Sequence, residues 1–79
     1  MQETRLDAEG LRRRAERAIE ESPYTQADVA RELDVSRASV NRALNQTTPK
    51  LEKLRRRIVE HLRGGRVEKR VTFVHVEDE

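Results

Sequence analysis

The chain has 79 residues, of which 41% are charged and 3% aromatic, so it makes one small domain with a limited core. It has no cysteine, which excludes disulfides and thiolate metal sites. No apolar run is long enough to cross a membrane and no signal-peptide pattern opens the chain, so we expect a cytoplasmic protein.

The net charge of +2 conceals an uneven distribution along the chain. Residues 1–35 carry 6 basic and 9 acidic side chains, whereas residues 36–70 carry 11 basic and 3 acidic ones. The chain ends on Glu77, Asp78 and Glu79. The basic middle of the chain is typical of a surface that neutralises phosphates, and a solvated arginine-rich face is the alternative.

The first predicted helix spans residues 7–21, and the sequence Ser22-Pro23 ends it. Its apolar stripe recurs at helical spacing and consists of Leu11, Ala15, Ala18 and Ile19. Acidic residues surround the arginines at positions 12–14 and form pairs four residues apart, as Arg12 does with Glu16. We therefore expect those arginines to form a solvated face.

Two short helices joined by a tight turn are predicted for residues 26–45. Thr25 is expected to cap the first helix, with Asp28 completing an acidic capping box, and Ser36 to cap the second. Val35 is expected to fill the turn. The buried faces of the two helices are predicted to contain Val29, Ala30 and Leu33, followed by Val40, Ala43 and Leu44. This spacing, with Arg, Asn and Ser in the second helix, is typical of a helix-turn-helix whose second helix enters the major groove of DNA.

The fourth predicted helix begins with Thr48 as N-cap and Pro49 as first residue, and Gly64-Gly65 ends it. Its buried stripe is predicted to consist of Leu51, Leu54, Ile58 and Leu62. Arg56 and Arg57 point away from this stripe and are expected to face solvent.

From residue 66 to residue 76 the pattern changes to that of a strand, with β-branched residues dominating. A lone strand leaves its backbone groups unpaired, so we expect it to pair with the same strand of a second copy; a hairpin around Glu68-Lys69 is the alternative. The chain thus divides into a helical domain, residues 1–65, and a dimerisation segment with an acidic tail, residues 66–79. The predicted dimerisation residues are Val67, Val71, Phe73, Val74 and Val76.

The sequence D-V-A at 28–30, followed by V-S-R-A-S-V-N-R-A-L-N at 35–45, resembles the helix-turn-helix of the lambda-repressor/Cro superfamily. It is also similar to the lactose-repressor-type headpiece. The sequence T-P-K-L at 48–51 and the apolar stripe after it resemble the next helix of repressor domains, so the resemblance covers somewhat more than half of the chain. Asp34 stands where the family usually has Gly in the turn, and Asp tolerates the left-handed conformation better than most residues.

The resemblance implies a mainly α fold. The expected architecture is a four-helix lambda-repressor-like domain with a C-terminal β-strand that pairs across a homodimer, as in the Cro branch. The strand-like tail stands where repressor domains normally have a fifth helix.

Candidate DNA contacts lie on and around the second helix of the motif. With Val40 facing inward, helical geometry places Ala38, Asn41, Arg42 and Asn45 outward, with Arg37 at the edge. Arg can pair with guanine, Asn with adenine, and the Ala methyl can contact thymine. The resemblance adds Ser39 to the base-contacting residues and makes Gln26 a phosphate contact that braces this helix. The full predicted phosphate-contacting set is Thr25, Gln26, Ser36, Gln46, Thr47, Thr48 and Lys50.

These residues predict a DNA-binding transcriptional regulator, nucleoid-associated, acting as a homodimer on a palindromic operator in double-stranded DNA. The sequence contains no arrangement typical of an enzyme, and we expect no cofactor and no metal, with His61 and His75 structural or solvated. The first alternative is an antitoxin-type DNA-binding protein whose C-terminal tail binds a protein partner. The second is an interaction module that does not bind DNA.

Overall fold

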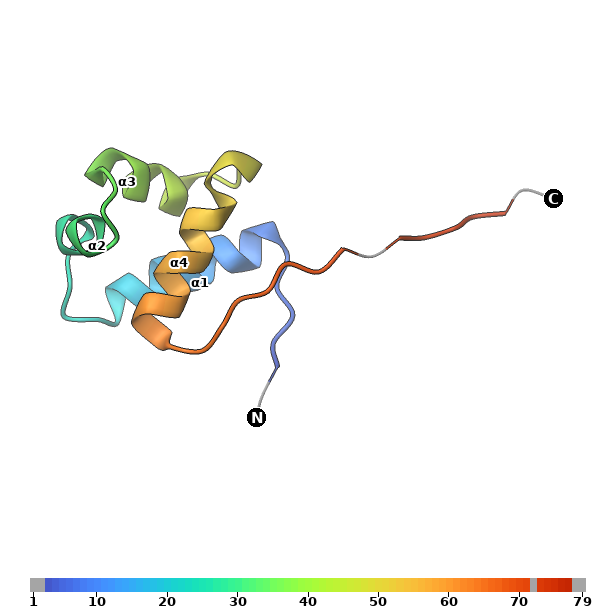
Figure 1. Ribbon diagram of the computed structural model, residues 1–79, viewed down its shortest axis with the longest axis horizontal. Helices are drawn as coiled ribbons and strands as arrows, with labels where there is room; N and C mark the ends of the chain where they lie inside the picture. Colours follow the sequence, from blue (N-terminus) through green and yellow to red (C-terminus); the bar gives the residue numbers. More distant parts are fainter. Residues whose placement is uncertain (1–2, 72, 78–79) are drawn as a thin grey trace.

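The computed structural model describes residues 3–71 and 73–77. Within these residues the protein is mainly helical, as predicted, with four α-helices and one turn of 3₁₀ helix (Figure 1). The elements are α1 Ala8–Glu20, α2 Gln26–Glu32, α3 Arg37–Asn45, η1 Pro49–Leu51 and α4 Glu52–Arg63. α1 and α4 pack on each other, and α3 contacts both of them as well as α2. None of the helices in this part of the chain is long and apolar enough to cross a membrane.

The N-termini of α2 and α3 are set by the local side chains that the sequence predicted. The hydroxyl of Thr25 accepts a hydrogen bond from the Asp28 amide at 3.1 Å, and the Asp28 carboxylate accepts one from the Thr25 amide at 2.9 Å, which completes the capping box of α2. The Ser36 hydroxyl caps α3 by accepting from the Ser39 amide at 3.0 Å. Asp34 has φ 57°, so the turn between α2 and α3 adopts the expected left-handed conformation without glycine.

The core is formed by the predicted apolar stripes. The four residues of the α1 stripe, the three of α2 and its C-cap, and the three of α3 are all buried, and Val35 packs against them from the turn. Leu54 and Ile58 of α4 are also buried, whereas Leu51 and Leu62 are half-buried. Val59 joins the core although the sequence did not single it out.

The start of α4 differs from the prediction. Thr48 makes no side-chain capping bond, and the 3₁₀ turn of η1 precedes the α-helix, which begins at Glu52. The Thr48 carbonyl accepts from the Leu51 amide at 3.2 Å and from an Arg55 guanidinium nitrogen at 2.8 Å. At the other end, Gly64 and Gly65 have φ values of 75° and 73° and end α4 as predicted.

Arg12, expected to face solvent, is half-buried and binds the end of another helix, and Arg56 is also half-buried, which corrects the sequence-based prediction. Arg57 is exposed as expected, although its guanidinium also binds a helix end. Arg12 donates to the Leu44 carbonyl at 2.7 Å, and Arg57 donates to the Leu33 carbonyl at 2.9 Å. The last carbonyls of a helix have no hydrogen-bond partner within that helix, so a guanidinium from a neighbouring helix can satisfy them. The partial negative charge at the helix C-terminus also favours a positive side chain at this place.

After α4, residues 66–71 and 73–77 form an extended segment, which we call the arm. Its first part is held against the body: the Val67 amide donates to Glu60 at 2.9 Å, Lys69 pairs with Glu52 at 3.3 Å, and Arg70 pairs with Glu3 at 2.7 Å. Beyond this anchored part the arm projects away from the helices (Figure 1).

The strand predicted for the arm is not formed in residues 66–71 and 73–77 of the single chain. A strand is defined by hydrogen bonds to a neighbouring strand, and the described chain provides none. Of the five predicted dimerisation residues, Val67 is partly buried against the core of its own chain. The other four are exposed, up to 90% for Phe73. The end of the acidic tail, Asp78 and Glu79, lies outside the described residues.

Candidate nucleic-acid interface

The outer face of α3 carries the predicted base-contacting residues. Its inner face is fixed in the core by Val40, Ala43 and Leu44, which are all buried. The helical repeat then places five of the predicted residues on the surface and leaves Ser39 half-buried. The five exposed ones are Arg37, Ala38, Asn41, Arg42 and Asn45. Because α3 lies at the edge of the molecule, this face is not covered by another helix (Figure 1).

Both asparagines on this face make hydrogen bonds within the protein. The Asn41 amide nitrogen donates to the side-chain oxygen of Gln26 at 3.4 Å, a long bond that links the first residue of α2 to the middle of α3. The bracing contact predicted for Gln26 is therefore present. The Asn45 amide nitrogen donates to the Asn41 carbonyl at 2.8 Å, so it must rotate before it can pair with an adenine edge.

The hydroxyls at the N-termini of α2 and α3 have capping roles that bear on their predicted contacts. Ser36 accepts from the Ser39 amide and donates to the Ser39 hydroxyl at 2.8 Å, so both serines are engaged with each other. Thr25 accepts from the Asp28 amide and keeps its own hydroxyl hydrogen for another acceptor. The bonds from the backbone and side chain of Thr25 lower the pKa of Asp28, which keeps this carboxylate charged.

The segment between α3 and α4 carries the remaining predicted phosphate contacts. These residues, Gln46, Thr47, Thr48 and Lys50, are all exposed. These residues follow directly after α3 in the chain, so the two predicted sets are adjacent in the sequence and both exposed. Gln26 and Thr25, at the N-terminus of α2, border the same surface through the bond to Asn41.

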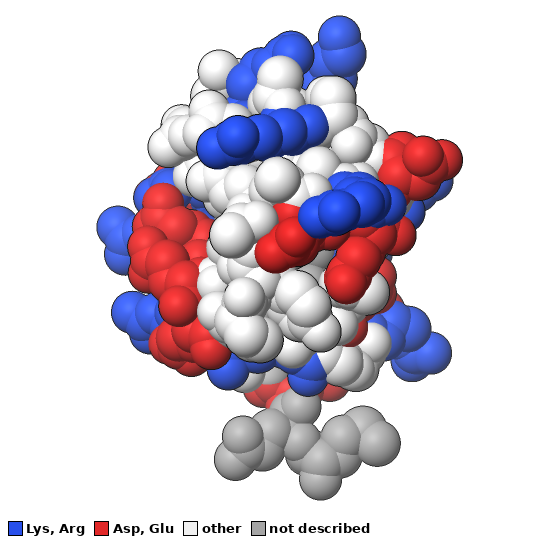
Figure 2. Space-filling view, turned by 90° about the vertical axis from the view of Figure 1, so that its left-hand side faces the viewer, with Lys and Arg blue, Asp and Glu red and all other residues white. Residues whose placement is uncertain are grey.

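The charge of this surface has one sign. From Ser36 to Leu51 the sequence contains Arg37, Arg42 and Lys50 and no acidic residue. Figure 2 shows Lys and Arg at the upper end of the molecule, the height at which α3 lies in Figure 1, whereas lower on the same face Lys and Arg are mixed with Asp and Glu. The arrangement suits a polyanion that approaches α3 from outside.

The two histidines lie away from this surface. His61 on α4 is exposed and forms an ion pair with Glu32 of α2 when protonated, and His75 lies in the arm 4.0 Å from Glu77. Among the described residues, no three His, Cys, Asp or Glu side chains are grouped so that they could hold a metal ion.

Sequence reasoning missed Arg55, which is 1% exposed and lies directly behind the α3–η1 segment. A signal was available in its spacing. Arg55 lies four residues after Leu51 and three before Ile58, so it belongs to the inward-facing stripe of α4. A charged residue at such a position needs buried polar partners, and these are found at the end of α3.

Comparisons with protein-family models, with curated proteins and with solved structures found no match for this chain.

Proposed function

We propose that this protein is a sequence-specific DNA-binding transcriptional regulator of the lambda-repressor/Cro type. The observation that carries the proposal is the outer face of α3. It combines two arginines and two asparagines with an uncovered helix surface that has no acidic residue. These are the side chains that read base edges in the major groove, and the groove is wide enough for one α-helix.

In this proposal the two parts of the surface have different tasks. Arg37, Asn41 and Arg42 of α3 contact base edges and determine the preferred sequence. Lys50 and the hydroxyl and amide groups of residues 46–48 contact phosphates and fix the register of the helix on the duplex. Gln26 contacts a phosphate and holds Asn41 in place, which its 3.4 Å bond in the free protein supports.

We further propose that the arm pairs antiparallel with the arm of a second copy. The four exposed apolar residues of the arm support this, because burying each completely contributes roughly 1.5–3 kcal/mol. Charge favours the antiparallel orientation: residues 66–70 have three basic side chains and one acidic, and the chain ends on three acidic ones. Antiparallel pairing places unlike ends together, and a two-fold dimer suits a palindromic operator.

The exposed arm also favours a second candidate, in which the same helices bind DNA and the arm captures a different protein, as in an antitoxin. An extended apolar segment can add a strand to the sheet of such a partner. The oligomeric state of the purified protein separates the two candidates, because self-pairing requires no partner.

Salt dependence tests the DNA-binding proposal. Duplexes that the protein prefers are first selected from a random pool, and their affinity is then measured as a function of salt concentration. If about five phosphates are neutralised per chain, a dimer is expected to show a slope of log K against log salt of roughly −9. A flat dependence, or no binding at low salt, contradicts the proposal.

Two variants then separate base reading from phosphate contact. Asn41→Ala is expected to lose about 1–3 kcal/mol on the selected site and to relax the preference at one base position. Lys50→Ala, the matched control, is expected to weaken binding to all sequences about equally because it removes only a phosphate contact. If both variants lower affinity without changing base preference, the assignment of the α3 face is wrong.

A further inference from the structure

Arg55 makes an unusual set of contacts for a buried charge. Its Nε donates to the Ala43 carbonyl at 2.8 Å, Nη1 donates to the Thr48 carbonyl at 2.8 Å, and Nη2 donates to the Gln46 carbonyl. None of the hydrogen-bond partners found for it in the described chain is a carboxylate. The desolvation that comes with burial lowers the pKa of Arg55 below the ordinary value for arginine. A buried charge of this kind is retained only where fixed dipoles compensate for its lost hydration.

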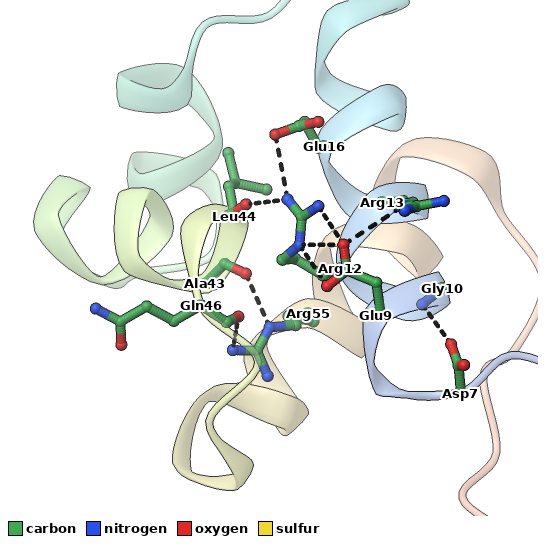
Figure 3. A network of polar contacts seen from close by, with 10 residues as sticks. All are labelled: Asp7, Glu9, Gly10, Arg12, Arg13, Glu16, Ala43, Leu44, Gln46 and Arg55. Atoms are coloured by element: carbon green, nitrogen blue, oxygen red, sulfur yellow. Dashed lines mark hydrogen bonds and ion pairs between the residues drawn. The ribbon is translucent and has the colours of Figure 1, made fainter.

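A second arginine binds the same helix end. Arg12 of α1 donates to the Leu44 carbonyl at 2.7 Å, and its guanidinium is held in place by Glu9 at 2.5 Å and by Glu16 at 3.4 Å. Figure 3 shows Arg12 and Arg55 converging on consecutive carbonyls at the C-terminal end of α3. We call these two residues the arginine clamp.

The clamp spans the junction between the two parts of the proposed DNA surface. Ala43 and Leu44 belong to α3, Gln46 follows its last residue, and Thr48 immediately precedes η1. One planar guanidinium therefore ties the end of the base-reading helix to the segment that carries the phosphate contacts. Without it, the carbonyls at this helix end would be left to water and the segment would be free to change its angle to α3.

We propose that the arginine clamp, and Arg55 above all, is a positioning element that sets base specificity by fixing α3 relative to the 46–48 segment. The inference rests on the proposed DNA-binding function. Base edges and phosphates lie at fixed spacings on a duplex, so a helix reads bases correctly only when its phosphate contacts hold the right register. Neither arginine has to touch DNA for this role.

Loosening the clamp is expected to reduce specific binding and to leave general attraction to DNA intact. The exposed charges at Arg37, Arg42 and Lys50 remain, and these dominate non-specific affinity. The decisive quantity is therefore the ratio of affinities for the selected site and for a random duplex.

The test variant is Arg55→Lys. Lysine keeps the charge but has a single terminal nitrogen, so it cannot bind three carbonyls spread over residues 43–48. We expect the ratio of specific to random affinity to fall about tenfold, the size of one lost base contact, with random-duplex affinity changed by about twofold or less.

Arg57→Lys is the matched control. It makes the same substitution two residues away on the same helix, and it too disturbs a guanidinium that binds a helix-end carbonyl, that of Leu33, the C-cap residue of α2. For Arg57→Lys we expect the ratio of specific to random affinity to stay within about twofold of the wild-type value, because the carbonyl that Arg57 binds is not at the end of α3. Equal losses in both variants would indicate general destabilisation and overturn the inference.

Amide hydrogen exchange provides a measurement on the free protein. The Gln46 amide, which donates to the Arg42 carbonyl at 2.9 Å, is expected to exchange faster in Arg55→Lys, while amides in the middle of α1 keep their protection. Unchanged exchange at Gln46 together with an unchanged affinity ratio overturns the positioning role. If Arg55→Lys does not fold, Arg12→Met is tested instead. Its ratio of specific to random affinity is expected to fall about threefold, and an unchanged ratio overturns the inference.

The two proposals fail in different ways. A wild-type chain that binds no duplex overturns the DNA-binding function and the specificity role with it. A wild-type chain that selects a sequence, with an Arg55→Lys variant that selects it equally well, overturns the clamp alone.

Discussion

The helical body and the arm both contain apolar residues, but these side chains are buried in the body and mostly exposed in the arm. In the body, Val29, Val40, Ala43 and Ile58 have no exposed surface, whereas Phe73 and Val74 in the arm are 90% and 80% exposed. A helix satisfies its own backbone hydrogen bonds, so amphipathic helices can close a core within one chain. An extended segment needs a neighbouring strand, so its apolar residues stay exposed until one is provided. This difference in exposure supports the proposal that the arm pairs with a second molecule, whereas the core of the body is closed within one chain.

The largest expected effect tests whether the stability of the monomer resides in the body. Ile58→Ala removes a side chain with 0% exposure and is expected to lower the free energy of unfolding by about 2–5 kcal/mol. Phe73→Ala is expected to change it by less than about 0.5 kcal/mol, because that side chain contacts solvent. Denaturant unfolding at protein concentrations low enough to keep the chain monomeric measures both. A comparable loss for Phe73→Ala would mean that the arm stabilises the body.

Removing the arm is expected to abolish self-association. The full chain is expected to be a dimer at tens of micromolar, and a chain ending at Gly65 a monomer with much weaker binding to the selected DNA. Sedimentation of both chains decides this. Phe73→Lys in the full-length chain is the control that keeps the backbone of the arm and removes its largest apolar side chain. A full-length monomer, or a dimer of the shortened chain, shows that the arm is not the interface.

The smallest effect concerns acid stability within the body. The hydrogen bond from Arg12 lowers the pKa of Glu9 from 4.5 to about 2, and the same contact raises the pKa of Arg12 above its ordinary value. Because the pKa of Glu9 is lower in the folded state, its stabilising contribution is present above pH 4.5 and lost as the pH falls toward 2.

Unfolding midpoints measured at several pH values from about 6 down to about 2 check this prediction, because carboxylates of this kind titrate in that range. Glu9→Gln is expected to lower stability slightly at neutral pH and to flatten the decline toward acid. Glu77→Gln removes a carboxylate from the arm and is the control, with an expected profile like that of the wild type. A Glu9→Gln profile that falls as steeply as the wild-type one contradicts the assignment.

The sequence by itself determined the features that depend on neighbours three or four residues apart. The capping box of Thr25 and Asp28, the Ser36 cap and the buried stripes of α1, α2 and α3 are present as predicted, and half of the predicted α4 stripe is buried. Such signals are readable because both partners lie within one helical turn. The outward face of α3 follows from the same periodicity, and its exposed residues match the prediction except for the half-buried Ser39.

Only the tertiary structure decided what the arginines do. Arg12, Arg55 and Arg57 bind carbonyls that lie 32, 12 and 24 residues away, respectively, at the ends of other helices. A backbone carbonyl has no residue-specific signature, so no pattern in the sequence identifies it as a partner for a distant guanidinium. The partner becomes defined only when packing brings a helix end, with its unpaired carbonyls, against the arginine.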